Sequence, residues 1–408
     1  MSVQVENPPI QLSAAAAQRP AGRGARISEE LTAMLKSAAS RGASDLLLVA
    51  NVPPTVSIRG EWVDLSSVAL SAENVEQLVD SLMNDEQRHK LHTVRDVDLG
   101  VTIPGVGRYR INLHYQRETL AAAIRAIPED IPAFDSLGLP EQVIQFADYS
   151  NGLVLVTGGT GQGKSTTLAA LIDHMNRGRR RHIITIEDPV EFAFKPGTCL
   201  IEQRQVGEDC PTFASALRFV LRQRPDVVLL GEVRDLETMA SALTAAETGH
   251  LVLATLHTCN ASQTIARIID VFPAAQQPQV RSQLAGSLRA ILCQSLIQDN
   301  LNDSLVPATE LLVATAAIRR AIRENETHLI SSMIETGRRM GMHTLEQSLE
   351  ELVKSGRITP ESAVLAAADP VRMQVMLGGA GGSAPRDRME VDLPAPKRSG
   401  SDIPWANE

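Results

Sequence analysis

Aromatic residues are scarce in this sequence: its 408 residues include two tryptophans, three tyrosines and seven phenylalanines. Aliphatic side chains must therefore build most of the core. Cysteine is also rare, because only Cys199, Cys210, Cys259 and Cys293 occur, with no C-x-x-C pair among them. This spacing argues against a zinc ribbon, which needs closely spaced thiolate pairs. Four scattered cysteines in so long a chain predict reduced, mostly buried thiols in a cytosolic protein.

The sequence also lacks a basic excess, a long apolar run and a secretory signal. Its 39 Lys and Arg residues against 48 Asp and Glu residues give a net charge of −9. This balance disfavours a protein that grips nucleic acid over a broad face, although it leaves room for a local basic patch. No apolar run approaches the roughly 18–20 residues of a membrane span. We therefore expect a chain that binds no nucleic acid and reaches a membrane only through partners.

Composition divides the chain into two ordered parts between two low-complexity ends. Residues 1–26 predict a disordered leader, and residues 377–408, dense in Gly, Pro, Ser and charge, predict a flexible tail. Short strands and helices over 27–135, bounded by Gly and Pro turns, predict an α+β domain with an antiparallel sheet. Three prolines within 128–140 predict a linker.

Over residues 141–376, short apolar strands alternate with amphipathic helices. Unbroken apolar strands between helices indicate a parallel sheet that is buried on both faces. The expected strands are 153–157, 183–187, 227–230 and 251–255. Among the helices that follow, one is expected over 280–293.

A phosphate-binding loop lies between the first of these strands and a helix-forming run. The residues GGTGQGKS match the pattern G-x-x-x-x-G-K-[ST] in the required strand–loop–helix context. Small residues let backbone N–H groups close around phosphate oxygens, and the helix N-terminus adds a positive dipole end. Lys164 can reach the β- and γ-phosphates, and the Ser165 hydroxyl can hold Mg²⁺. We expect ATP to be bound by Gly158, Gly159, Thr160, Gly161, Gln162, Gly163, Lys164, Ser165 and Thr166.

Acidic residues follow two of the other apolar strands. The segment ITIEDPVEF places Glu187, Asp188 and Glu191 at a strand end, where open α/β sheets bind ligands. The segment DVVLLGEVRD ends its strand with Glu232, where an acid can orient the attacking water or a water on Mg²⁺. Such residues taken alone are more often a solvated acidic turn. Beside a phosphate-binding loop they are candidate catalytic groups.

Two histidines flank the strand of the segment TAAETGHLVLATLHT. His250 precedes the strand and His257 follows it. A lone histidine is more often a core or capping residue than a catalyst. Both interpretations stay open here, because positioning a strand end needs no proton transfer.

These four segments, in this order, resemble the secretion ATPase superfamily, which powers type II secretion and type IV pili. The resemblance covers about residues 27–370. It implies a smaller α+β, PAS-like N-terminal domain joined flexibly to an α/β P-loop (RecA-like) C-terminal domain, assembled as a hexameric ring. Gly159 and Gln162 depart from the usual family loop, but neither side chain is needed for the backbone to cradle phosphate.

Within the superfamily the sequence is most similar to the pilus retraction ATPases. It lacks the long extra N-terminal region and the tetracysteine zinc motif of extension and secretion ATPases. Residues 317–325, AIRRAIREN, resemble a C-terminal motif associated with retraction. An amphipathic helix, with Ile318 on its apolar stripe and Arg319 in solvent, explains the segment equally well. The alternatives are an accessory retraction ATPase, an extension or type II secretion ATPase, and a RecA-like nucleic-acid motor. A degenerate, non-hydrolysing scaffold is disfavoured by the intact Lys164, Ser165, Glu191 and Glu232.

The resemblance also implies roles for single residues. Glu191 would be the general base or water-positioning acid, and Glu232 would support water and Mg²⁺ together with Ser165. Arg110 and Arg125, on strands of the first domain, would stabilise the γ-phosphate; without the resemblance they read as surface ion pairs. Supporting roles would fall to Glu187, Asp188, His250 and His257.

The implied function is ATP hydrolysis coupled to movement. One domain would pivot against the other across the 128–140 linker, and a ring of six chains would turn or push an inner-membrane pilus platform protein. Other pilus motor ATPases are further candidate partners. The implied location is the cytoplasm, at the inner face of the inner membrane.

Overall fold

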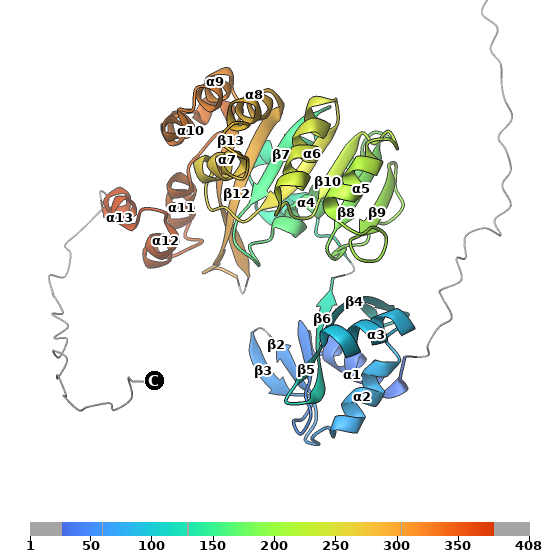
Figure 1. Ribbon diagram of the computed structural model, residues 1–408. Helices are drawn as coiled ribbons and strands as arrows, with labels where there is room; N and C mark the ends of the chain where they lie inside the picture. Colours follow the sequence, from blue (N-terminus) through green and yellow to red (C-terminus); the bar gives the residue numbers. More distant parts are fainter. Residues whose placement is uncertain (1–26, 59, 129, 303, 379–408) are drawn as a thin grey trace, which may run out of the picture.

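The computed structural model describes residues 27–58, 60–128, 130–302 and 304–378 (Figure 1). The predicted leader lies outside these residues, and so does the predicted tail except for 377 and 378. Within these ranges the chain forms two sheets, one of six strands and one of seven. No helix within the described ranges is both long and apolar enough to span a membrane. The four cysteines are free thiols; three are buried and Cys259 is exposed.

The six-stranded sheet is antiparallel throughout, as the sequence predicts, in the order β3–β2–β1–β6–β5–β4. Buried residues alternate along β5 and along most of β4, and leucines and valines of three helices cover the buried face. The strands are β1 (Asp45–Leu48), β2 (Thr55–Ile58), β3 (Glu61–Asp64), β4 (Asp96–Ile103), β5 (Gly107–Gln116) and β6 (Thr119–Ile127). The helices are α1 (Glu29–Ser40), α2 (Ala72–Asp80) and α3 (Asp85–Val94).

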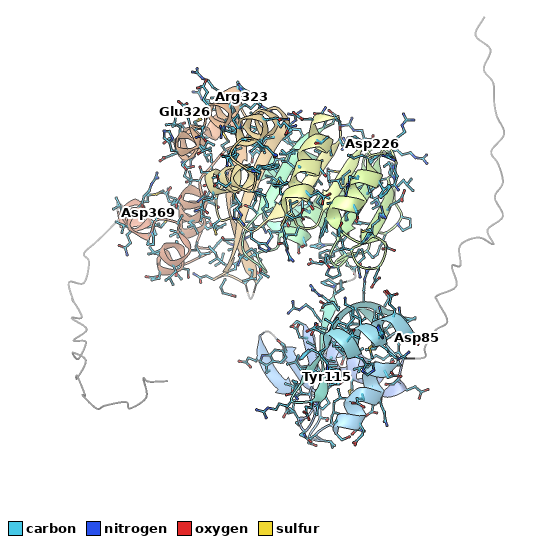
Figure 2. All side chains as sticks on the ribbon, in the orientation of Figure 1. Asp85, Tyr115, Asp226, Arg323, Glu326 and Asp369 are labelled. Atoms are coloured by element: carbon cyan, nitrogen blue, oxygen red, sulfur yellow. The ribbon has the colours of Figure 1, made fainter. Side chains whose placement is uncertain are left out.

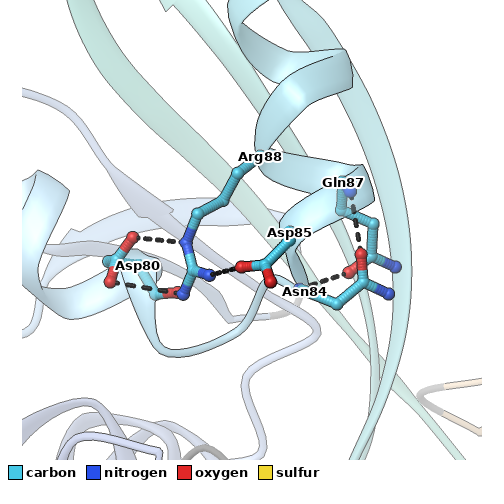
Figure 3. Close-up of polar contacts among 5 residues, drawn as sticks. All are labelled: Asp80, Asn84, Asp85, Gln87 and Arg88. Atoms are coloured by element: carbon cyan, nitrogen blue, oxygen red, sulfur yellow. Dashed lines mark hydrogen bonds and ion pairs between the residues drawn. The ribbon is translucent and has the colours of Figure 1, made fainter.

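A corner separates α2 from α3. Asn84 starts α3 with a capping box, in which its side chain accepts from the Gln87 N–H at 2.8 Å (Figure 3). Arg88 then reaches back to Asp80 at the end of α2, with Nε 2.9 Å from Oδ1. An N-cap this strong begins a new helix, so the chain turns here.

The seven-stranded sheet has the order β13–β12–β7–β11–β10–β8–β9. Its strands from β12 to β9 run parallel to their neighbours, and β13 is antiparallel to β12. The four predicted strands correspond to β7 (Gly152–Thr157), β8 (His182–Glu187), β10 (Val227–Leu230) and β11 (Leu251–Leu256). The sequence did not predict β9 (Leu200–Gln205), β12 (Leu288–Gln298) and β13 (Leu305–Val313).

Helices cover both faces of this sheet (Figure 1). One face packs against α4 (Lys164–Arg177) and the 3₁₀ segments η2 (Phe134–Leu137) and η3 (Glu141–Asp148). Phe134, within the predicted linker, is buried in that core. The other face packs against α5 (Phe213–Val220), α6 (Leu236–Glu247), α7 (Ala261–Asp270) and α8 (Gln277–Ser287).

The helix expected over 280–293 is confirmed for residues 280–287 and wrong for residues 288–293. The helix α8 ends at Ser287, and residues from Leu288 onward form β12 between β7 and β13. The run LRAILC is apolar almost throughout because the strand is buried on both faces. Periodicity does not distinguish such a strand from a buried helix.

The C-terminal helices are α9 (Ala316–Arg323), α10 (Ile330–Thr336), α11 (Leu345–Lys354), α12 (Pro360–Ala366) and α13 (Pro370–Gly378). The first of them is amphipathic as expected, and Ile318 is fully buried. Arg319 is not a solvated residue, however. Its guanidinium donates to the carbonyl oxygens of Ala285 at 2.6 Å and Leu288 at 2.7 Å, at the end of α8. Burial lowers the pKa of Arg319, and this cation satisfies carbonyls that the helix end leaves free.

Glu310 is a buried acid in the middle of β13, with 7% of its surface exposed. Its Oε1 accepts the N–H of Ala261, the first residue of α7, at 2.7 Å. Burial raises the pKa of Glu310 to about 7; the Ala261 hydrogen bond opposes the rise and nearby Glu346 adds to it. Between pH 4.5 and about 7, the Glu310 carboxyl is therefore protonated in the folded protein and ionised in the unfolded chain.

Replacing Glu310 with Gln should make stability less dependent on pH. Between pH 4.5 and about 7 the unfolded carboxyl is ionised and the folded one is protonated, so raising the pH favours the unfolded chain. This group should cost about 3 kcal/mol of unfolding free energy across that window. Denaturant titrations at several pH values measure it, with Glu361→Gln, an exposed acid of α12, as the control. A slope in Glu310→Gln as steep as in the unaltered chain would contradict the assignment.

Candidate nucleotide-binding site

The loop between β7 and α4 has a backbone that only glycine adopts readily. Gly158, Gly161 and Gly163 have φ angles of +144°, +76° and +77°. A Cβ at Gly158 would overlap the carbonyl oxygen of Gln294, and one at Gly163 would lie 2.8 Å from the Gln294 amide nitrogen. The loop is therefore pressed against β12, and its conformation leaves the amino end of α4 open to a ligand.

Lys164 lies inside this loop, with 9% of its surface exposed. Its Nζ donates to the carbonyl oxygens of Gly158 at 2.9 Å and Gly159 at 2.7 Å. Burial lowers the pKa of Lys164, while the charges of Glu232 and Glu191 raise it. The structure thus brings the loop lysine and these two acids, which come from three different strand ends, into one electrostatic environment.

Gln294 of β12 supports the loop and was not identified from the sequence. Its Oε1 accepts from the Thr167 hydroxyl at 2.9 Å, and the backbone N–H of Leu296 donates to the side chain of Gln162. Gln162 is thus a bridge to β12, which gives this departure from the usual family loop a structural role. No sequence signal marks Gln294, because its strand begins inside the helix expected over 280–293 and continues past the end of that helix.

The acids after β8 have different environments. Glu187 is held by the Thr185 hydroxyl at 2.6 Å and by the Gln203 amide at 3.2 Å. Burial raises the pKa of Glu187, and these hydrogen bonds oppose the rise. Asp188 and Glu191 are exposed. Glu187 is therefore engaged inside the fold, whereas the other two acids face solvent.

Gln203 of β9 also holds the segment that carries Glu191. Its amide nitrogen donates to the carbonyl oxygen of Phe192 at 2.8 Å, and its Oε1 accepts the N–H of Phe194 at 3.1 Å. The segment has no regular secondary structure, so these side-chain contacts replace the ladder of a strand.

Glu232, just after β10, is fixed by two partners. The Arg234 guanidinium donates to both of its oxygens, and His257 Nε2 lies 2.8 Å from Oε1. Partial burial raises the pKa of Glu232, but Arg234 and His257 together bring it below its usual value. A carboxylate held in this way is ionised at neutral pH and cannot reorient freely.

The two histidines of the sequence motif lie at opposite edges of the sheet. His257 follows β11 at the carboxyl edge, beside Glu232. His250 precedes β11 at the amino edge, where its carbonyl oxygen accepts the N–H of Gly152. At the same edge, the carbonyl oxygen of Asp226 accepts the N–H of Leu251, the first residue of β11. Figure 2 shows Asp226 on the side of this sheet away from the six-stranded sheet. The structure does not bring His250 to the phosphate-binding loop.

Arg110 and Arg125 are direct cross-strand neighbours on β5 and β6. Both lie on the face opposite the helices. Arg110 Nε is 3.8 Å from Asp98 Oδ1, and Arg125 Nε is 2.7 Å from Asp45 Oδ1. In this conformation, each arginine is thus paired within its own sheet.

The loop geometry fits the phosphate groups of a nucleotide. Its positive-φ glycines turn the backbone around the amino end of α4, and Lys164 supplies a cation at that position. Ser165 lies in the first turn of the helix, where a hydroxyl can reach a metal ion bound to phosphate.

Comparison with known proteins agrees with this geometry. Residues 120–357 match the family model described as type II/IV secretion system protein. The chain is 43% identical to the type IV pilus retraction ATPase PilT of Pseudomonas aeruginosa, over 82% of this chain and 97% of the relative. It is 38% identical to the type IV pilus ATPase PilU of the same organism, over 86% and 92% respectively. A crystal structure of the pilus retraction motor PilT with bound ADP superposes with a TM-score of 0.79 at 45% identity, covering 84% of this chain and 98% of that one.

The chain belongs to the type II/IV secretion ATPase family. Its fold is that of the PilT-like ATPases, with mixed α/β sheets, and it is an ATPase. The structural neighbour carries ADP, which agrees with a nucleotide at the loop between β7 and α4.

Replacing Lys164 with Ala should abolish ATP hydrolysis and weaken nucleotide binding. The substitution removes the cation inside the loop described above, which would reach the β- and γ-phosphates of a bound nucleotide. Phosphate release and the binding of a fluorescent ATP analogue measure the two effects. The control is Lys354→Ala, which removes an exposed lysine of α11. Phosphate release near that of the unaltered chain would contradict the assignment.

Proposed function

We propose that this chain is a motor ATPase that drives the retraction of type IV pili. The observation that carries the proposal is the phosphate-binding loop with Lys164, Glu191 and Glu232 around it, in a chain that matches a pilus retraction ATPase over 97% of that relative. A twitching motility protein of Neisseria gonorrhoeae, 41% identical over 90% of its length, supports the same assignment.

In the proposed reaction, the loop and Lys164 hold the phosphates of ATP. Ser165 would hold Mg²⁺ directly and Glu232 would hold it through water. Among the residues that the structure describes, no group of three or more acidic, histidine or cysteine side chains could hold a metal ion alone. The phosphate oxygens would therefore complete its coordination, as is usual for Mg²⁺. The metal would neutralise charge that develops on the phosphates.

Glu191 is our candidate for the acid that positions or deprotonates the attacking water. It is exposed and it lies near enough to Lys164 to affect the pKa of that amine. Glu187 is less suitable because its Oε1 already accepts hydrogen bonds from Thr185 and Gln203, and burial raises its pKa. Asp188 supports the same strand end, and His257 would link the end of β11 to Glu232.

Arg110 and Arg125 would reach the γ-phosphate when the six-stranded sheet closes on the nucleotide. A guanidinium suits this position because its planar fork pairs with phosphate oxygens. Closure would break the ion pairs with Asp98 and Asp45, which are partly exposed and so cost little to separate. The hinge would lie in the part of the 128–140 segment that precedes Phe134, because Phe134 is buried against the seven-stranded sheet.

We further propose a hexameric ring that acts on a pilus platform protein at the inner face of the inner membrane. The N-terminal domain would be PAS-like and the C-terminal domain RecA-like, with limits near residues 27–135 and 141–376. Movement of the sheets during hydrolysis and release would supply the mechanical step.

The second candidate is an accessory retraction ATPase, which the likeness to PilU favours. Extension and type II secretion ATPases are more distant alternatives within the family. A nucleic-acid motor is disfavoured by the net charge of −9. Stimulation of ATP hydrolysis by single-stranded DNA would instead support a nucleic-acid motor.

The phenotype of a deletion strain tests the proposed direction of movement. Loss of a retraction motor should leave cells over-piliated and unable to twitch. Loss of an extension motor should leave them without pili. Complementation with the unaltered chain should restore twitching and complementation with Lys164→Ala should not. Bald cells would contradict retraction.

Glu191→Ala and Glu232→Ala should separate chemistry from binding. Each variant should bind ATP normally, because the loop is intact, but lose turnover by about 10²–10⁴-fold, the usual contribution of a group that positions or activates water. Binding of an ATP analogue and steady-state phosphate release measure the two quantities. If Glu191→Ala keeps more than about a tenth of the activity, the role passes to Glu232 or Glu187.

Arg110→Ala and Arg125→Ala should reduce turnover without unfolding the protein. An arginine that stabilises the γ-phosphate can contribute about 10³–10⁵ in turnover. Circular dichroism tests the fold, and light scattering with a non-hydrolysable ATP analogue tests for the hexamer. Arg117→Ala, at the turn between β5 and β6, is the control. A monomer that turns over as fast as the unaltered chain would show that neither arginine nor ring is required.

A further inference from the structure

Gln205, the last residue of β9, hydrogen-bonds the segment that carries Glu191. Its Oε1 accepts the N–H of Val190 at 3.2 Å. Gln205 is 7% exposed and Val190 is 5% exposed, so water cannot readily replace either partner. Because Val190 directly precedes Glu191, this hydrogen bond fixes the backbone from which the Glu191 carboxylate projects.

The same side-chain amide also faces the six-stranded sheet. A Cβ at Gly100 of β4 would lie 3.3 Å from Gln205 Nε2 and 3.4 Å from Oε1. The contact with Nε2 is tighter than most Cβ contacts, so a side chain at position 100 would make the amide shift by a few tenths of an ångström. Gly100 therefore provides the space into which Gln205 fits.

A second group joins the same two parts of the chain. Glu208, in the turn after β9, has a pKa that burial raises. A hydrogen bond from the Gly100 backbone and the charge of Arg108 partly offset this rise. Gln205, at the end of β9, thus lies against β4, and Glu208, in the turn that follows, interacts with residues of β4 and β5.

The face of the sheet that contacts Gln205 is the face that carries the two candidate arginines. Gly100 is the cross-strand partner of Arg110, which is in turn the partner of Arg125. Directly opposed residues of antiparallel strands project to one face. A displacement of this face relative to β9 therefore moves both arginines and the surface against which Gln205 packs.

We propose that Gln205 is a positioning residue that couples the six-stranded sheet to Glu191. The position of Gly100 determines where the Gln205 amide lies. The amide in turn holds the backbone at Val190, and this backbone determines the position of the Glu191 carboxylate. The proposal rests on the role of Glu191 proposed above. Small displacements suffice, because a misplacement of about 1 Å at a reacting group can cost about 10²-fold in rate.

Two substitutions at position 205 test the hydrogen bond itself. Gln205→Met has a similar length but cannot accept from Val190, so kcat should fall at least about tenfold with KM within about twofold. Gln205→Glu keeps an acceptor at the same place and should retain kcat within about threefold. A merely structural role would lower the folded fraction and leave the kcat of the folded enzyme unchanged in both variants.

Two substitutions on β4 test the link to the other sheet. Gly100→Val should lower kcat because its side chain displaces the Gln205 amide. Thr102→Val changes an exposed residue two positions along the same face of β4 and should leave kcat unchanged. In the double variant Gly100→Val with Gln205→Met, the loss should equal that of Gln205→Met alone, because one amide transmits both effects.

The outcomes separate this proposal from the proposed function. If Glu191→Ala is inactive and Gln205→Met turns over normally, the coupling is overturned and the role of Glu191 stands. If Glu191→Ala is active, the role of Glu191 fails and the coupling fails with it. Should Gln205→Met not fold, the comparison of Gly100→Val with Thr102→Val decides, and equal kcat values would overturn the proposal.

Discussion

The close approach of the phosphate-binding loop to β12 is the constraint on which the site depends. Gly158 lies where any side chain would overlap the Gln294 carbonyl oxygen, and the Gln294 side chain occupies the space beside Gly163. The loop therefore has no freedom to collapse toward the sheet. Because it is held from behind, its backbone stays curved around the helix end without a ligand to shape it. Lys164 fills the curve with a cation that is bonded to the loop's own carbonyl oxygens.

The acids around the loop differ in the number of hydrogen bonds and ion pairs that they form with other residues. Glu187 is engaged by Thr185 and Gln203, and Glu232 is clamped by Arg234 and His257. Glu191 is exposed, on a segment without regular structure. Such an arrangement suits a site in which two acids fix geometry and a third takes part in the reaction. Hydrogen bonds from Gln203 and Gln205 of β9 hold the backbone of this segment and so restrict its movement.

Features that depend on local sequence were predictable, and those that depend on tertiary packing were not. The strand–loop–helix motif and the acids at the ends of β8 and β10 follow from residue type and spacing. The strand β12 was missed because its apolar run has no period that marks it as a strand. The strand β9 was missed because its Glu202, Gln203 and Arg204 are unlike a buried strand. Gln294 and Gln203, which support the site, lie on these two strands and could not be identified.

The position of Arg319 carries the same lesson. Arg319 has the spacing of a solvated residue on an amphipathic helix. Its long side chain instead finds free carbonyl oxygens at a helix end that lies more than 30 positions away in the sequence.

Arg319 has a consequence for the segment AIRRAIREN, in which it lies. One of its acceptors is Leu288, the first residue of β12, and β12 is the strand against which the phosphate-binding loop is pressed. The segment is therefore part of the scaffold of the nucleotide site as well as an exposed helix. A change there that abolished movement of a pilus could do so by loosening the support behind ATP, with the surface that meets other proteins left untouched. A motility assay alone would not distinguish a motor that no longer binds its partner from one whose nucleotide site has lost its structural support.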